Sequence, residues 1–453
     1  MDKGEISMKK NWELTLSEGI KEISDKSMTA TDWINSIFER IDFCEDKIHA
    51  WAFLDKEVAI QKAKEIDDGS FISGPLLGAP IGVKDIIDVK QMPCEGNSPI
   101  LKGNIPKEDA YCISKLRQSG AIIAGKTVTT QFATGDPSET LNPWNTLHSP
   151  GGSSSGSAAS VASGMIPAAL GSQTGGSVLR PSAYCGIIGF KPSYGLISRS
   201  GVIEVSWTFD HIGILSRSVE DAALLLKYLS GPDDLDDTTQ GFEPLIYGDF
   251  IPKKPTLVCY PKKDIAKYAD PEVTRWVDEG VEKLKEKDIQ VDEIDFPIDL
   301  QRLHDTHRMI MGVDAASYHK DSFSKNADKY RPVIRALIES GLSTSSINYA
   351  RGLRQRNRLI RDMEKILNHY EFIILPSFQD PPALVEESTG SAFFNEPATQ
   401  PGLPAITLPL GRGDKNLPFA IQFIGKRFFD YPLLENAAWC EKELDWTSQI
   451  IDF

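Results

Sequence analysis

The sequence has few cysteines and no paired-cysteine motif. Six cysteines are spread over 453 residues, and none forms a Cys-x-x-Cys pair. This spacing argues against a zinc knuckle and against the dense disulfide framework of a small secreted domain. We expect buried free thiols at Cys44, Cys94, Cys112, Cys185, Cys259 and Cys440.

Long apolar runs and an excess of positive charge are also missing. No uncharged apolar stretch approaches the ~20 residues of a membrane-spanning helix, and residues 1–20 contain no apolar segment typical of a signal peptide. The 49 basic and 64 acidic side chains give a net charge of -15, which opposes binding to phosphate backbones or anionic lipids. We therefore predict a soluble, cytoplasmic protein with no nucleic-acid or membrane partner.

Alternating strand and helix patterns predict an α/β protein. Apolar residues make up 41% of the chain and charged residues 25%, as in ordinary globular enzymes. Helical spacing covers residues 13–66, with Thr29 and Thr31 as capping candidates, and also residues 300–370. Short apolar runs predict strands at 79–87, 121–127, 167–171, 256–260, 289–296 and 371–377. Strands that alternate with helices favour a largely parallel sheet.

Residues 149–177 are rich in glycine, serine and alanine, a composition that flexible linkers share. Apolar residues nevertheless recur within this segment, which disfavours a linker. We expect a tightly packed helix of small residues at 156–164, followed by a strand.

Two sequence motifs occur in contexts that do not suit them. Residues 120–127 satisfy the phosphate-binding pattern GxxxxGK[ST], but the intervening Ala-Ile-Ile-Ala predicts a strand where a phosphate cradle needs a loop. Ser154 lies at the centre of a GxSxG pattern, but no strand precedes it as a nucleophile elbow requires. A nucleotide hydrolase that uses the GAIIAGKT segment therefore remains only a weak alternative.

His304 and His307 stand three positions apart on a predicted helix and could share a metal. No carboxylate or cysteine cluster obviously completes such a site, so we expect both to be solvated and predict no metal and no cofactor. None of the seven histidines lies in a segment that demands a catalytic base. The sequence therefore favours a mechanism that does not use a histidine base.

Three features fit a single chemistry: Lys84 at the end of an apolar strand, a Gly-Gly-Ser-Ser turn at 151–154, and a Gly-Gly-Ser turn at 175–177. Together with the blocks PIGVKD, SPGGSSSGSAASVASGMIPAALGSQTGGSVLRPSAYCG and QPGLPAITLPLG, they make the chain similar to the amidase signature family. This family includes fatty acid amide hydrolase and the A subunit of the glutamyl-tRNA amidotransferase. The resemblance covers most of the chain, and Ser153 and Ser177 have the family's spacing of 24 positions.

The resemblance implies that Ser177 is the nucleophile, Ser153 the bridging serine behind a cis Gly152–Ser153 bond, and Lys84 the general base. A serine hydroxyl is a weak nucleophile until a base takes its proton, and lysine can act as that base only when neutral. Burial in a low dielectric can lower a lysine pKa far enough. A hydroxyl both donates and accepts, so Ser153 can relay a proton between the other two.

The family's oxyanion hole corresponds to Thr174, Gly175 and Gly176, with the backbone N–H of Ser177. The chain departs from the family at two positions near the nucleophile. Many members read DTGGSIR, whereas this sequence has the neutral Gln173 and places Arg180 one position later. These two changes leave the partner of Arg180 and the role of Gln173 open.

The resemblance also implies the fold, an α/β domain over residues 1–453 with a central, mixed, mostly parallel sheet and helices on both faces. We expect N-terminal helices at about 13–66, a signature core at about 76–230 and a C-terminal α/β part at about 255–453. A small-molecule amide is the expected substrate, and analogy suggests a homodimer.

The main rival function is the A subunit of a tRNA-dependent amidotransferase, which works within a complex. The QTGGSVLRP block is more similar to stand-alone amidases. Which amide is cut does not follow from the sequence. We expect the acyl pocket to be lined by 92–100, 138–144, 202–207, the helices of 300–350, and 372–384.

Overall fold

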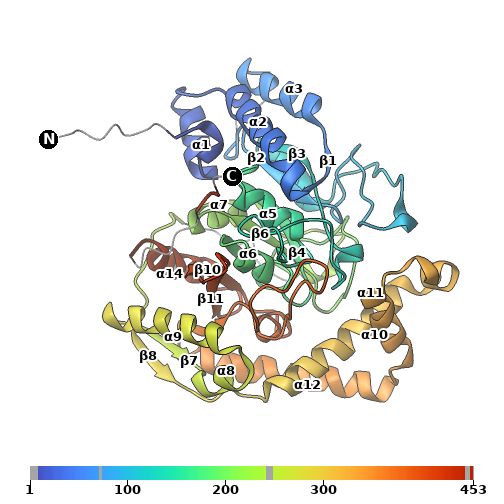
Figure 1. Cartoon of the computed structure of the whole chain (residues 1–453), viewed down its shortest axis with the longest axis vertical. Helices are drawn as coiled ribbons and strands as arrows, with labels where there is room; N and C mark the ends of the chain where they lie inside the picture. The colour runs from blue at the N-terminus through green and yellow to red at the C-terminus, as the bar shows by residue number, and fades with distance from the viewer. Residues whose placement is uncertain (1–8, 71–73, 241–247, 444–448, 452–453) are drawn as a thin grey trace.

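The computed structural model describes residues 9–70, 74–240, 248–443 and 449–451 (Figure 1). Its centre is one sheet of eleven strands in the order β1-β3-β2-β4-β6-β5-β10-β11-β9-β7-β8. The strands are β1 (Trp51–Leu54), β2 (Pro80–Lys84), β3 (Ile122–Thr127), β4 (Ala168–Gln173), β5 (Ile188–Lys191), β6 (His211–Ser216), β7 (Leu257–Tyr260), β8 (Gln290–Glu293), β9 (Phe372–Pro376), β10 (Ala405–Arg412) and β11 (Pro418–Gly425). Each of the six predicted strand segments overlaps one of these strands, and five contain the whole strand, since β4 extends two residues beyond the predicted 167–171.

The sheet is mixed, as predicted, but it is not mostly parallel. Within the described residues, the pairs β2–β3, β2–β4, β7–β8 and β7–β9 are parallel, and the other six neighbouring pairs are antiparallel. The prediction was wrong because apolar runs do not show strand direction. For example, β10 and β11 are joined by a short turn, and such a connection forces them to run antiparallel.

Helices flank the sheet. They are α1 (Leu16–Ser24), α2 (Ala30–Ile48), α3 (Lys56–Asp67), α4 (Tyr111–Gln118), α5 (Ser155–Ala162), α6 (Leu179–Tyr184), α7 (Val219–Leu229), α8 (Lys262–Tyr268), α9 (Pro271–Glu286), α10 (Leu300–Asn326), α11 (Pro332–Ser343), α12 (Ser346–Leu367), α13 (Glu396–Thr399) and α14 (Asp430–Glu443). In Figure 1, α1 to α3 gather at one end of the molecule and α10 to α12 at the other. None of the helices within the described residues is long and apolar enough to cross a membrane.

The N-terminal part is less uniformly helical than predicted. Thr29 caps α2 as expected, because its side chain accepts a hydrogen bond from the Asp32 N–H in a capping box. Residues Trp51–Leu54, however, form the edge strand β1 between α2 and α3. The helical spacing of α2 ends at Ile48, and His49 then adopts a left-handed conformation that stops the helix.

The small-residue segment is a buried helix, α5, followed by β4, as predicted. Every residue of α5 is buried. A Cβ on Gly156 would lie 2.2 Å from the Ala50 carbonyl oxygen and 2.4 Å from the Val128 nitrogen. Small residues are therefore required here because the helix packs directly on backbone. The six cysteines are all buried and free, as predicted.

Candidate active site

Lys84 ends β2 with its side chain fully buried. Its Nζ lies 2.7 Å from Ser153 Oγ and 2.8 Å from Ser172 Oγ. Burial lowers the pKa of Lys84 well below that of a free lysine; the charge of Asp210 opposes this shift, and that of Arg180 adds to it. The structure thus provides the environment in which a lysine amine can be neutral at working pH.

Ser177 lies in the turn between β4 and α6 and is 7% exposed. The turn is fixed by Gln173, whose side-chain oxygen accepts hydrogen bonds from the backbone N–H groups of Val178 (2.9 Å) and Leu179 (3.0 Å). These N–H groups begin α6 and would otherwise lack acceptors. The neutral residue that departs from the family pattern therefore has a defined role as a helix cap.

The predicted oxyanion residues are held in place from several sides. Thr174 Oγ1 donates to Asp210 Oδ1 at 2.5 Å, and Thr399 Oγ1 donates to the Gly175 carbonyl at 2.7 Å. Within the described part of the chain, the backbone N–H groups of Gly175, Gly176 and Ser177 have no protein acceptor. They are therefore available to a substrate oxygen.

Gly176 leaves no room for a side chain. A Cβ there would lie 2.3 Å from Asn395 Oδ1. Asn395 is itself fixed, because its Nδ2 donates to the Ser377 carbonyl at 2.9 Å. Glycine at this position thus follows from close contact with a rigid neighbour.

Arg180 connects the two serine segments. Its Nη2 donates to the Gly152 carbonyl at 2.6 Å, and its backbone N–H donates to the Gly176 carbonyl at 2.8 Å. The Gly152–Ser153 peptide bond is cis, as the resemblance implies. Burial lowers the pKa of Arg180 to about 10, so the guanidinium stays charged at neutral pH. The displaced arginine thus has a partner within the site.

A cavity of about 320 Å³ opens beside Ser177. Its lining combines the turn 174–177 with Arg180, residues 133–135, one face of α10, two residues of α11, and the loop 389–392 with Glu396. Of the predicted pocket segments, Val205 and residues of α10 and α11 contribute. The stretches 92–100, 138–144 and 372–384 do not line this cavity. They were chosen by their position in the sequence, which does not show which loops meet beside Ser177.

The two misleading motifs have structural roles. Lys126 is buried on β3, where its Nζ lies 3.0 Å from Asp85 Oδ1 and 3.0 Å from the Pro93 carbonyl. It is thus an ion-paired strand residue rather than part of a phosphate loop. Ser154 is buried before α5, and its Oγ donates to the Ser172 carbonyl at 3.3 Å. It therefore ties the Ser153 segment to β4.

The expectation that both histidines are solvated was wrong for His307, which is buried, whereas His304 is partly exposed. His304 Nδ1 lies 2.7 Å from Glu396 Oε2, and this hydrogen bond raises the pKa of His304. His307 is fully buried and stacks on Phe209 with ring centroids 4.1 Å apart; burial lowers its pKa to about 4. Among the residues that the structure describes, no group of three or more His, Cys, Asp or Glu side chains could hold a metal ion.

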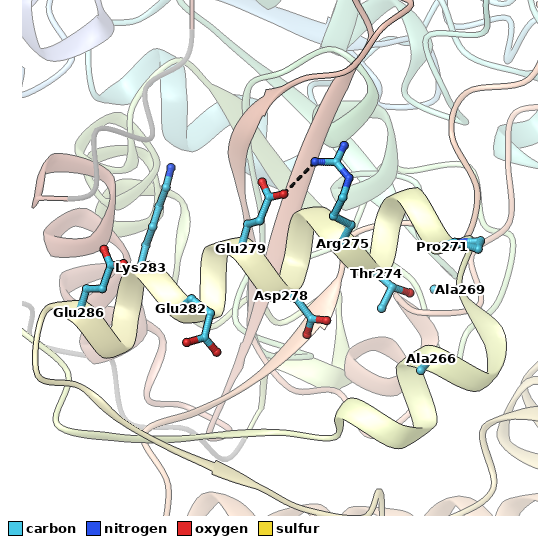
Figure 2. Close-up of a pocket in the computed structure, with 10 residues that line it drawn as sticks. All are labelled: Ala266, Ala269, Pro271, Thr274, Arg275, Asp278, Glu279, Glu282, Lys283 and Glu286. Atoms are coloured by element: carbon cyan, nitrogen blue, oxygen red, sulfur yellow. Dashed lines mark hydrogen bonds and ion pairs between the residues drawn. The ribbon is translucent and has the colours of Figure 1, made fainter.

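A larger hollow, of about 780 Å³, lies along α9 and next to the end of α8 (Figure 2). Figure 2 shows its charged side chains spaced along the outer face of α9, with Arg275 and Glu279 paired at 2.8 Å. Such i,i+4 pairs are ordinary on solvated helices. None of the predicted catalytic residues lines this hollow, so we place the candidate site at Ser177.

Ser172 and Asp210 were missed by the sequence analysis. Ser172 lies on β4, the parallel neighbour of β2, and is the second hydroxyl beside Lys84. Asp210 immediately precedes β6, the antiparallel neighbour of β4, and also accepts from the Val205 and Ser206 N–H groups. Only the order of the strands could have suggested either residue.

The chain is similar to known proteins over nearly its whole length. The family described as Amidase matches residues 32–434. The A subunit of the glutamyl-tRNA(Gln) amidotransferase from Natranaerobius thermophilus is 32% identical over 475 residues, covering 95% of this chain and 96% of the relative. A crystal structure of an amidase is 27% identical with a TM-score of 0.83, covering 94% of this chain and 99% of its own.

The fold has a further structural neighbour. A chain from an inhibitor-bound complex connected with the evolutionary origins of an s-triazine catabolic enzyme has a TM-score of 0.88 at 23% identity, covering 96% of this chain and 99% of its own. That likeness concerns the fold alone. The family match and the relative from N. thermophilus span nearly the whole chain, which therefore belongs to the amidase signature family of hydrolases acting on amide bonds.

Proposed function

We propose that this protein hydrolyses a small carboxylic amide to an acid and an amine or ammonia through an acyl-enzyme on Ser177. One observation carries the proposal: the buried Lys84 amine contacts Ser153 at 2.7 Å, in a site where Arg180 bonds both the Ser153 segment and the Ser177 turn. A lysine at the end of a buried strand with only hydroxyl partners is suited to proton transfer.

In the attack step, the neutral Lys84 accepts the proton of the Ser153 hydroxyl, and Ser153 accepts that of Ser177. Ser177 Oγ then bonds to the amide carbon. Negative charge develops on the carbonyl oxygen, where the N–H groups of Gly175, Gly176 and Ser177 stabilise it.

In the collapse step, the proton returns from Lys84 through Ser153 to the amide nitrogen, which leaves as a neutral amine. Water then attacks the acyl-enzyme and gives up its proton along the same path, releasing the acid and restoring the Ser177 hydroxyl. No metal or cofactor takes part in either step.

Labelling with a fluorophosphonate tests the assignment of the nucleophile. Wild type should be labelled on Ser177, and Ser177→Ala should lose both the label and nearly all turnover. Ser155→Ala is a matched control, because Ser155 is a buried serine of the neighbouring segment whose hydroxyl has no partner among the described residues. A label on Ser154, found by peptide mapping, would instead support the nucleophile-elbow interpretation.

A second candidate is the A subunit of an amidotransferase, favoured by the 32% identity to the relative from N. thermophilus. In that case the chain would need partner subunits to act. Purification from the native host and assay of the isolated chain separate the two functions. Amide turnover by the chain alone favours the stand-alone amidase; a co-purifying protein that is required for turnover favours the amidotransferase.

A further inference from the structure

The cavity beside Ser177 carries net positive charge in a protein whose total charge is -15. Four of its lining side chains are ionisable: Arg180, His304, Arg308 and Glu396. Glu396 is 1% exposed and bonded to His304. With His304 neutral, two arginines and one glutamate leave a net charge of +1, and protonation of His304 would raise it further.

Arg308 is the cation in this lining whose guanidinium makes no hydrogen bond or ion pair within the described part of the chain. Arg180 already donates from Nη2 to the Gly152 carbonyl, although its buried Nε has no partner among the described residues. The carboxylate that shares the cavity, Glu396, is engaged by His304 at 2.7 Å. An arginine presents five N–H donors in a planar fork that matches a carboxylate.

The wall that carries Arg308 also sets the size and character of the ligand. His304, Arg308 and Met311 lie at i, i+4 and i+7 on α10, so they share one face of the helix. Val333 and Leu337 of α11 add apolar surface to the same cavity. A volume of about 320 Å³ is at the small end for ligand sites, which suits a short carbon chain.

We propose that the substrate is a small amide that also carries a carboxylate, which Arg308 binds while the amide carbon lies at Ser177. This inference rests on the proposed amidase function and names its substrate class. The apolar side chains of α10 and α11 accommodate the chain between the two groups. Arg308 is thus a specificity-determining residue for this reaction.

Matched substrate pairs provide the test. ω-Carbamoyl carboxylates with two to five methylene groups are compared with neutral amides of the same length, for example succinamate with butyramide. For the best-fitting length, wild type should favour the acid in kcat/KM by roughly 10- to 150-fold, the range expected for a charged hydrogen-bonded contact. Arg308→Gln should lower this ratio at least tenfold, and Arg308→Lys should restore part of it.

Arg302→Gln is the matched control. Arg302 lies on the same helix, is exposed, bonds Gln355 and does not line the cavity, so the ratio should stay at its wild-type value. Binding gives a readout that does not depend on catalysis. In a Ser177→Ala background, calorimetry should show binding of the best-fitting carbamoyl carboxylate that Arg308→Gln weakens at least tenfold. Circular dichroism checks that each variant is folded.

The outcomes distinguish this inference from the function on which it rests. A labelled Ser177 and turnover of neutral amides, with a wild-type acid-to-neutral ratio near one at every length, would overturn the inference alone. An Arg308→Gln ratio equal to that of wild type would also overturn it. Failure to turn over any amide, with no label on Ser177, would refute the proposed function and the inference together.

Discussion

Replacing Lys84 with alanine tests whether this residue transfers protons or only shapes the site. In the proposed mechanism, Lys84 takes a proton during attack and returns it to the leaving nitrogen. An amine cannot leave as an anion, whereas the phenolate of an aryl ester leaves without a proton. One general acid–base step contributes roughly 10²- to 10⁴-fold. Lys84→Ala should therefore lower kcat/KM at least roughly 10²-fold more for an anilide than for the aryl ester of the same acyl group.

The pH dependence supplies a second readout of the same variant. Burial lowers the pKa of Lys84, and the charged amine cannot accept a proton. Wild-type kcat/KM should therefore fall as the pH drops through that lowered pKa, and this acidic limb should be absent in Lys84→Ala. Folding stability should depend on pH in the same direction, falling on acidification. The neutral lysine contributes stability that is fully present above its unfolded pKa of ~10.4 and is lost as the pH falls through the folded pKa.

Lys126→Met is the control for removing a buried lysine. Lys126 is equally buried on the neighbouring strand β3, but its partners are Asp85 and the Pro93 carbonyl. Its substitution should affect stability without changing the anilide-to-ester ratio. Equal losses on both substrates in Lys84→Ala, with the acidic limb preserved, would show that Lys84 only holds the site's shape.

Three further predictions concern the rest of the site. Arg180→Met removes a charged hydrogen bond to the Gly152 carbonyl, worth about 1.5–3 kcal/mol, so steady-state kcat/KM should fall roughly 10- to 150-fold. Gly176→Ala should abolish fluorophosphonate labelling, because its Cβ would lie 2.3 Å from Asn395 Oδ1, whereas Gly248→Ala, with nothing within 4 Å, should label normally. Prolonged dialysis against a strong chelator should leave turnover intact, and a loss that zinc restores would contradict the metal-free mechanism.

Strand positions were predictable because a buried strand appears in the sequence as a short run of apolar residues. Segments such as 371–377 are apolar on both sides of the strand, since both faces of the sheet are covered. Strand direction cannot be read from such runs, because they look alike in parallel and antiparallel strands. The pairing of β4 with β6 and of β5 with β10 depends on how the chain returns to the sheet, so the mixed character followed from the resemblance and the antiparallel majority did not.

The site, too, has residues that the sequence shows directly and residues that only the fold brings close. Lys84, Ser153 and Ser177 lie in glycine-rich motifs that the sequence displays directly. The residues that hold the turn before Ser177 come from distant segments. Asp210, which bonds Thr174, is 36 positions away, and Thr399, which bonds Gly175, is 224 positions away. Such partners are ordinary residues in their own segments, and only the fold brings them to the turn.

Gln173 shows how a departure from the family pattern can fit the chemistry. Its side-chain oxygen caps α6, and its Nε2 donates to Thr399 Oγ1 at 2.9 Å, which in turn donates to the Gly175 carbonyl. A carboxylate could accept from α6 but has no proton to donate to Thr399. It would also place negative charge next to Ser172, whose hydroxyl contacts Lys84, and so favour the charged lysine. A neutral amide at position 173 therefore both orders the turn that carries the proposed oxyanion N–H groups and helps keep the proposed base neutral.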